Sequence, residues 1–185
     1  MLCVCYTFVF CVVLSGMNFA IQITCYLETT HTVLIVPIDI MATNRNMNCE
    51  HISINSFNCR GIRDFKKRAT IFHWLSNKHG GISLLQETHS MVEDESVWKR
   101  EYGGIIYYSH GTNQSRGVAI LIPDHITHRF KHLSVEKDIE GRLLILNCEI
   151  DNNPLLLINV YAPTKDLGSQ QMLFFRQFEE LFRAA

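Results

Sequence analysis

Hydrophobic and polar residues follow two periods along this chain, one typical of strands and one typical of helices. Short apolar runs bounded by glycine, proline or polar residues predict buried strands. These runs lie at 52–58, 81–85, 105–109, 118–122, 143–150 and 155–160. A spacing of three to four residues predicts a helix from Asp64 to about His79 and a second helix from Ser169. The buried face of the first helix is predicted to carry Phe65, Ala69, Phe72 and Leu75 or Ser76.

Helix and strand alternate early in the chain, and hairpin-like strands follow later. This order predicts an α/β (α+β) fold in which two sheets form a sandwich flanked by helices. The acidic segment 90–100 is predicted to be a loop or a brief helix anchored by Trp98. The last helix is expected to present an apolar face without a cover, made of Phe174, Phe175, Phe178 and Phe182.

Residues 1–44 differ in composition from the rest of the chain. They contain no Lys or Arg and two acidic residues, Glu28 and Asp39. The chain's 18 acidic residues less these two leave 16 against 17 basic ones, so residues 45–185 have a net charge of +1. Basic residues of a signal peptide are missing, and polar residues interrupt the apolar run that a membrane-spanning helix needs. We expect residues 1–44 to be a gene-model extension, with a signal or membrane anchor in residues 1–40 as the alternative.

The overall charge predicts no broad basic surface for nucleic acid. The net charge is −1 and the pI about 6.7, so any attraction to phosphate must be local. The best local candidate, which we interpret as a solvated helix face, is the cluster of Arg60, Arg63, Lys66, Lys67 and Arg68. The seven cysteines show no paired spacing for zinc. Those of the second segment, Cys49, Cys59 and Cys148, are expected to be reduced and mostly buried.

Polar side chains stand where three of the predicted strands end. Asn58 ends the first of these strands, Glu87 follows the strand at 81–85, and Asn159 and Tyr161 come at the end of the last one. Ligands collect at such strand ends in α/β proteins, so we expect these residues to face one site. An amide oxygen and one carboxylate suit a hard cation such as Mg²⁺, which keeps several of its waters.

Four motifs carry a resemblance to a known family: SFNCRGI (56–62), LLQETH (84–89), SRGVAILI (115–122) and LINVYAPT (157–164). In this order they resemble the endonuclease/exonuclease/phosphatase superfamily, and within it the apurinic-like endonuclease domain of LINE-type (non-LTR) retrotransposon proteins. The resemblance covers about residues 49–180. It implies a DNase I-like fold for residues 45–185, hydrolysis of a DNA phosphodiester with Mg²⁺ or Mn²⁺, and a reverse transcriptase domain in the intact parent protein.

The resemblance also implies roles for single residues. Glu87 is expected to be the principal metal ligand, and Asn58 to shape the metal and phosphate site. Tyr161 is expected to contact the scissile phosphate, with Asn159 supporting the strand end. Arg116 and Gly117 are assigned to structure.

The family's later catalytic segments, Gly-Asp-x-Asn and Ser-Asp-His, have no counterpart after Tyr161. We therefore expect an amino-terminal part of the domain, with the carboxyl-terminal half missing and no activity in this form. The alternatives are a superfamily member acting on RNA or another phosphoester, and a non-catalytic remnant of the fold. An intracellular location is expected, nuclear if the protein acts on genomic DNA, with a membrane or secreted location as the alternative.

Overall fold

Two β-sheets form the body of the protein. The computed structural model describes residues 11–15, 19–23, 38–42, 52–76, 81–163 and 168–184. The four-stranded sheet has the order β1 (Cys11–Ser15), β10 (Asn153–Val160), β9 (Leu143–Ile150), β8 (Phe130–Lys137). The six-stranded sheet has the order β2 (Phe19–Ile23), β3 (Ile38–Ala42), β4 (Ile52–Asn58), β5 (Ile82–Gln86), β7 (Val118–Ile122), β6 (Ile105–Ser109).

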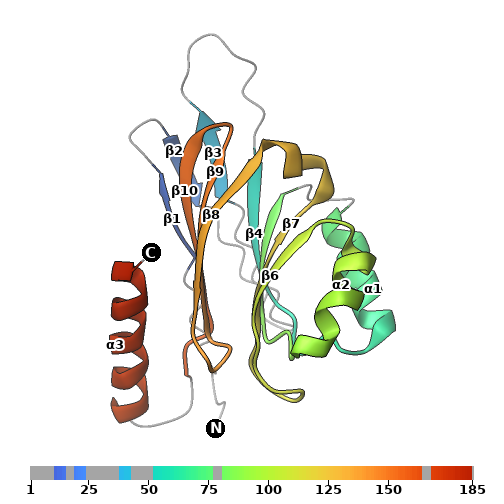
Figure 1. The fold of residues 1–185 in the computed structure, drawn as a ribbon, viewed down its shortest axis with the longest axis vertical. Helices are drawn as coiled ribbons and strands as arrows, with labels where there is room; N and C mark the ends of the chain where they lie inside the picture. Colours follow the sequence, from blue (N-terminus) through green and yellow to red (C-terminus); the bar gives the residue numbers. More distant parts are fainter. Residues whose placement is uncertain are drawn as a thin grey trace, which may run out of the picture.

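The helices lie on the outer faces of the two sheets (Figure 1). They are α1 (Phe65–Trp74), α2 (Glu95–Tyr102) and α3 (Gly168–Ala184). In Figure 1 the order across the molecule is α3, the four-stranded sheet, the six-stranded sheet, and then α1 with α2. Short 3-10 turns, η2 (Val92–Asp94) and η3 (Asp124–Arg129), precede α2 and β8. The predicted arrangement of two sheets with helices outside is confirmed in this coarse form.

The period of two along the strands divides the apolar residues among three cores. The cluster between the sheets takes alternate residues of the inner faces: Ile52, Ile54, Ile82, Leu84, Val118, Ile120, Leu144, Leu146, Leu155 and Leu157 among others. The residues between them face outward. Leu85, Ala119 and Leu121 pack with α1 and α2, and Ile145, Ile158 and Val160 pack with α3. Each sheet is therefore covered on both faces, which explains why its central strands read as almost continuous apolar runs.

Helix α1 begins where the sequence predicts. The side chain of Asp64 caps it by accepting a hydrogen bond of 2.8 Å from the Lys67 N–H. The predicted face is wrong at its first position, because Phe65 is 61% exposed and Arg68 is buried instead. The end predicted near His79 lies outside the described residues. The acidic segment 90–100 contains η2 and most of α2, and Trp98 anchors it as predicted, with 2% of its surface exposed.

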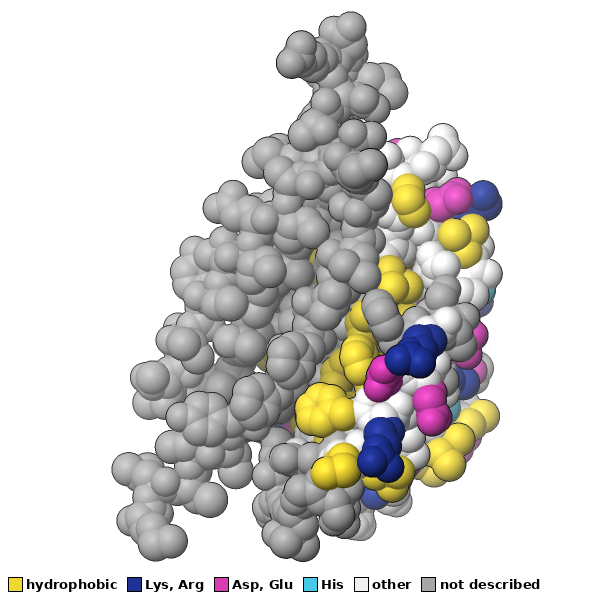
Figure 2. All heavy atoms as spheres, turned by 90° about the vertical axis from the view of Figure 1, so that its left-hand side faces the viewer, with side chains coloured by type: hydrophobic (Ala, Val, Ile, Leu, Met, Phe, Trp, Pro, Cys, Tyr) yellow, Lys and Arg dark blue, Asp and Glu magenta, His cyan; other side chains and the backbone are white. Residues whose placement is uncertain are grey.

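Helix α3 only partly fits the prediction of an uncovered apolar face. Phe174 is 5% exposed and packs on the four-stranded sheet, so its predicted exposure is wrong, and Phe178 is partly buried there. Phe175 is 51% exposed as predicted, and the side chain of Phe182 lies outside the description. Met172 and Leu173 are also exposed. Figure 2 shows the side of the molecule on which α3 lies. Apolar side chains are exposed on this side, among charged ones.

The sequence pattern does not predict β8. It forms an edge of the four-stranded sheet, with a bulge between His132 and Ser134 and alternating charged residues. Such polar, irregular edges protect sheets from aggregation and weaken the strand pattern in the sequence.

The leading segment also contributes β1, β2 and β3, with Cys11 of β1 opposite Asn159 of β10. The division at residue 44 stays a prediction. None of the described helices has the length and apolar character needed to cross a membrane.

Candidate functional site

The inner faces of three strands change from apolar to polar at one end of the sandwich. In β4 the row of Ile52 and Ile54 continues with Ser56 and Asn58. In β5 and β10 the corresponding inner rows end in polar residues: Gln86 in β5, and Asn159 followed by Tyr161 in β10. Because alternate residues of a strand share a face, these side chains are directed to the same end of the space between the sheets.

Asn58 and Glu87, the two predicted metal residues, are in direct contact. The side-chain Nδ2 of Asn58 donates to Glu87 Oε1 over 3.0 Å, while the side-chain Oδ1 of Asn58 accepts from the Arg60 N–H over 3.1 Å. The second contact fixes which way the amide points, since a backbone N–H can only donate. Asn58 therefore orients the Glu87 carboxylate, and a direct role as metal ligand would use the remaining lone pair of its oxygen.

The two strand ends are also joined through their backbones. Asn58 lies opposite Gln86 in the parallel pairing of β4 with β5. Beyond the strands, the Cys59 N–H donates to the Gln86 carbonyl over 2.8 Å and the Gly61 N–H donates to the Glu87 carbonyl over 2.6 Å. The carboxylate of Glu87 is thus held on a short, hydrogen-bonded extension of the sheet.

The donor set at this position fits Mg²⁺ better than it fits zinc. Mg²⁺ is bound by one or two carboxylates and keeps several waters, whereas zinc takes three or four histidine, cysteine or carboxylate ligands. Within the described part of the chain, no group of three or more His, Cys, Asp or Glu side chains could hold a metal ion. A magnesium ion would be held by the Glu87 carboxylate, with the Asn58 amide beside it.

Asn159 connects the two sheets rather than lining the surface. Its side chain is 1% exposed. It accepts from the Gln86 side chain over 2.7 Å and donates to the carbonyls of Leu85 and Ala119 over 2.9 and 2.8 Å. The Asn159 side chain thus joins β10 to the six-stranded sheet through buried hydrogen bonds, two of which go to the residues directly before Glu87, Leu85 and Gln86.

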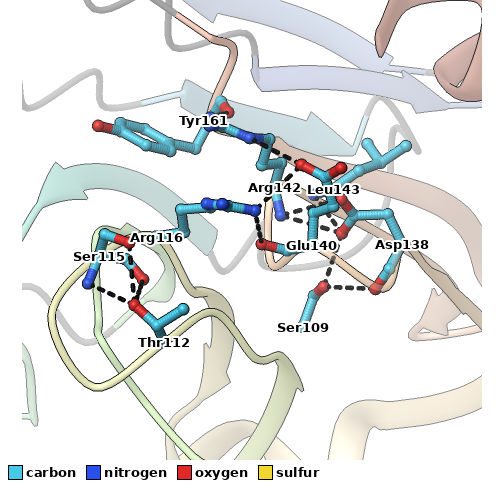
Figure 3. Close-up of polar contacts among 9 residues, drawn as sticks. All are labelled: Ser109, Thr112, Ser115, Arg116, Asp138, Glu140, Arg142, Leu143 and Tyr161. Atoms are coloured by element: carbon cyan, nitrogen blue, oxygen red, sulfur yellow. Dashed lines mark hydrogen bonds and ion pairs between the residues drawn. The ribbon is translucent and has the colours of Figure 1, made fainter. Parts of the chain in front are cut away.

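Tyr161 lies in a second group of polar residues, which Figure 3 shows in close-up. Its N–H donates to the Arg142 carbonyl over 2.7 Å, and Arg142 in turn donates to the Tyr161 carbonyl over 3.2 Å. The Arg142 guanidinium also lies 5.6 Å from the centre of the Tyr161 ring. Arg116 and Glu140 complete this group.

Backbone strain is concentrated in the loops at this end. Of the six non-glycine residues with positive φ in the described part of the chain, four lie here: Arg60, Glu87, His89 and Arg116. Gly117 has a φ of +86°, and a Cβ at this residue would lie 2.5 Å from the Thr88 hydroxyl. Positive φ values at non-glycine residues persist only where the surroundings impose them, and they cluster at functional sites.

Burial determines the ionisation of the two titratable neighbours of the metal position. It raises the pKa of the Cys59 thiol far above its ordinary value, so this cysteine stays protonated and inert. Burial also lowers the pKa of His89, with Glu87 opposing and Lys67 reinforcing the shift. Cys59 and Cys148 are free and buried as predicted, and Cys49 lies outside the described residues.

The prediction that the basic cluster forms a solvated helix face is wrong for one residue, Arg68. Arg68 is 5% exposed, and its guanidinium donates to both carboxylate oxygens of Glu101, over 2.6 and 3.0 Å. It also lies over the Trp98 ring, 5.2 Å from its centre. Arg68 therefore joins α1 to α2, while the other four members are exposed.

The sequence does not predict that Arg116 and Arg142 lie together. Arg116 is expected to be structural, and no pattern marks Arg142. The two arginines share only an adjacent glycine, and 25 residues lie between them.

Comparison with known proteins shows that the chain is similar in sequence to a transposon protein. No family model matches it. Over 124 residues, or 67% of the chain, it is 34% identical to the Transposon TX1 uncharacterized 149 kDa protein of Xenopus laevis. The matched part covers 9% of that protein, so the chain corresponds to a small portion of its length. The similarity supports a transposon-related origin.

Proposed function

We propose that this chain carries the metal-binding part of a Mg²⁺-dependent DNA endonuclease from a retrotransposon-derived protein. The observation that carries the proposal is the hydrogen bond of 3.0 Å between Asn58 and Glu87, at the adjoining ends of the parallel strands β4 and β5. The order of the four sequence motifs and the similarity to a transposon protein support it.

The residues of the site divide the work among them. Glu87 supplies the charge that holds the cation, and Asn58 keeps that carboxylate in one orientation. Asn159 fixes β10, and with it Tyr161, against the strand that leads to Glu87. Bound Mg²⁺ would act as a Lewis acid on phosphate oxygens. DNA is the proposed substrate, a reverse transcriptase domain the proposed neighbour in the intact protein, and the nucleus the proposed location.

Metal binding can be tested apart from catalysis with Mn²⁺, whose binding is followed by electron paramagnetic resonance. Glu87→Gln removes the carboxylate charge and keeps the size of the side chain. Its affinity for Mn²⁺ should fall by about tenfold or more, because the substitution removes the charged ligand of the proposed site. The matched control is Glu93→Gln, an exposed acidic residue of η2, which should bind Mn²⁺ as the unmodified chain does.

The same variants are then compared in a plasmid-nicking assay with Mg²⁺. Nicking by the unmodified chain that is lost in Glu87→Gln and kept in Glu93→Gln supports the endonuclease. Absence of nicking in all three is the result expected of an inactive amino-terminal part of the domain, and the Mn²⁺ measurement then carries the test of the metal site. Equal affinity of the unmodified chain and Glu87→Gln for Mn²⁺ would refute the proposed site. Cleavage of a matched RNA strand in preference to DNA would instead favour the RNA-directed member of the superfamily.

A further inference from the structure

Two arginines from different loops share one carboxylate oxygen beside Tyr161 (Figure 3). Arg116 ends the loop between β6 and β7, and Arg142 lies between β8 and β9. A guanidinium nitrogen of Arg116 lies 3.1 Å from Glu140 Oε2, and the Nε of Arg142 lies 3.4 Å from the same oxygen. Both arginines can therefore reach a single oxygen atom placed at this point.

The loop that carries Glu140 and Arg142 is held rigidly. The Asp138 carboxylate accepts from the N–H groups of Arg142 and Leu143, over 2.9 Å each, and from the Ser109 hydroxyl over 2.8 Å. The carboxylate of Asp138 is thus used to hold the loop and to join it to β6.

The two loops are also joined directly. The Gly117 N–H donates to the Gly141 carbonyl over 2.9 Å. Gly141 has a φ of +72°, and a Cβ there would lie 2.4 Å from the His110 carbonyl oxygen, so the backbones approach as closely as glycine permits. The distance between Arg116 and Arg142 is therefore set by the backbone, before any ligand arrives.

Glu140 satisfies the arginines only weakly. Its side chain is 50% exposed, and exposed ion pairs contribute about 0–1 kcal/mol to stability. One carboxylate oxygen also faces two guanidinium groups at this position. A phosphodiester offers two such oxygens, and arginine matches their planar spacing better than lysine does. The adjacent Tyr161 ring, under the Arg142 guanidinium, closes one side of the position.

We propose that Arg116 and Arg142 form a clamp for a backbone phosphate of DNA, and that Glu140 occupies this clamp until DNA displaces it. The clamp rests on the proposed endonuclease function and assigns it a substrate contact outside the metal position. It also explains how a chain with a net charge of −1 can attract DNA, since the positive charge is concentrated at one prepared position.

Binding of a fluorescein-labelled DNA duplex, measured by anisotropy in the presence of EDTA, tests the clamp without metal or hydrolysis. Glu140→Gln frees the arginines and should tighten binding by about fivefold, the equivalent of one surface charge pair. Arg116→Asn should weaken binding, and the slope of log Kd against log salt should fall by about 0.9, as expected for one lost phosphate contact. Asparagine tolerates the left-handed backbone of this residue.

The matched control is the exposed ion pair of Lys131 and Glu149 on β8 and β9, whose atoms lie 2.9 Å apart. Lys131→Gln and Glu149→Gln change the net charge by the same amounts, so their effect on binding measures the general contribution of charge. The clamp requires a larger effect at Arg116 and Glu140 than at this pair. The gain expected from Glu140→Gln cannot arise from unfolding, which would only weaken binding.

Three results would overturn the clamp: no DNA binding by the unmodified chain, equal effects at the two ion pairs, or weaker binding by Glu140→Gln. Each of them leaves the Mn²⁺ measurement on Glu87→Gln standing as a separate test of the metal site. Conversely, the chain could bind DNA through the clamp and show no affinity for Mn²⁺ at Glu87. That result would support the clamp and refute the proposed endonuclease.

Discussion

Asn159→Ala is the most informative single change for the way this fold positions its site. The substitution removes an amide that is 1% exposed and that makes three hydrogen bonds across the two sheets. Both N–H groups and the oxygen are used. Alanine cannot replace any of them, and a side chain that is 1% exposed has almost no contact with solvent.

The expected loss of stability follows from these contacts. A buried hydrogen bond contributes about 1 kcal/mol net, and acceptors left without a partner add to this, so the three bonds amount to about 3–4 kcal/mol. Part of this loss is avoided because the Gln86 side-chain amide keeps its hydrogen bonds to the Ser56 hydroxyl and the Leu84 carbonyl, each 3.1 Å long. We therefore expect about 3 kcal/mol, a large share of the 5–15 kcal/mol typical of a folded domain.

Urea unfolding followed by Trp fluorescence measures this loss. Asn113→Ala is the matched control, since Asn113 is an exposed asparagine in the loop before β7 and should change stability by less than about 0.5 kcal/mol. A shift below about 1 kcal/mol for Asn159→Ala would refute the structural role. Stability equal to the unmodified chain together with a loss of nicking would instead assign Asn159 a role at the reaction site.

Two further predictions concern the supports of the site. The Arg68 hydrogen bond lowers the pKa of the Glu101 carboxyl, so its stabilisation is present above the ordinary carboxyl pKa and is lost as the pH falls through the lowered one. The difference in unfolding free energy between the unmodified chain and Arg68→Ala should therefore shrink as the pH falls below the ordinary glutamate pKa of 4.5. A difference that stays constant with pH would contradict the ion pair. Gly117→Ala adds a contact of 2.5 Å with Thr88 to the cost of positive φ and should lower stability by about 1–3 kcal/mol. Gly103→Ala has a similar φ of +81° with no atom within 4 Å, so an equal loss in both variants would exclude a role for the contact.

The sequence predicts the central strands well because their signal is local. The runs at 118–122 and 143–150 have the observed ends, since both strands are buried on both faces and bounded by polar or turn residues. The run at 105–109 also has the observed ends, although β6 is partly exposed at the edge of its sheet. Another edge strand, β8, carries a weaker signal. Strand β8 exposes Leu133 and Val135, so its apolar residues do not mark a buried face and its sequence resembles a loop.

The site could be predicted in part for the same reason. The strand ends at Asn58 and Glu87 are adjacent in a parallel pair, and that neighbourhood follows from the order of strands and the intervening helix. The orientation of the Asn58 amide does not follow from the sequence, because it depends on the backbone turn at Arg60. Arg68 looked like a surface residue for a related reason: its partner Glu101 lies 33 residues later, on another helix.

No local sequence pattern predicts the contacts between the two sheets. These contacts determine how the proposed metal position and the proposed clamp are related. Glu87 belongs to the six-stranded sheet, whereas Tyr161 and Arg142 follow or precede strands of the other one. Several polar contacts bridge this division, among them those of the Asn159 side chain and the backbone pair of Gly117 and Gly141. Both bridges join residues more than 20 positions apart and end within two residues of a proposed functional group. Weakening either bridge should therefore alter the position of the phosphate contacts relative to Glu87 before it unfolds the sheets, since each sheet retains its own hydrogen-bond ladder.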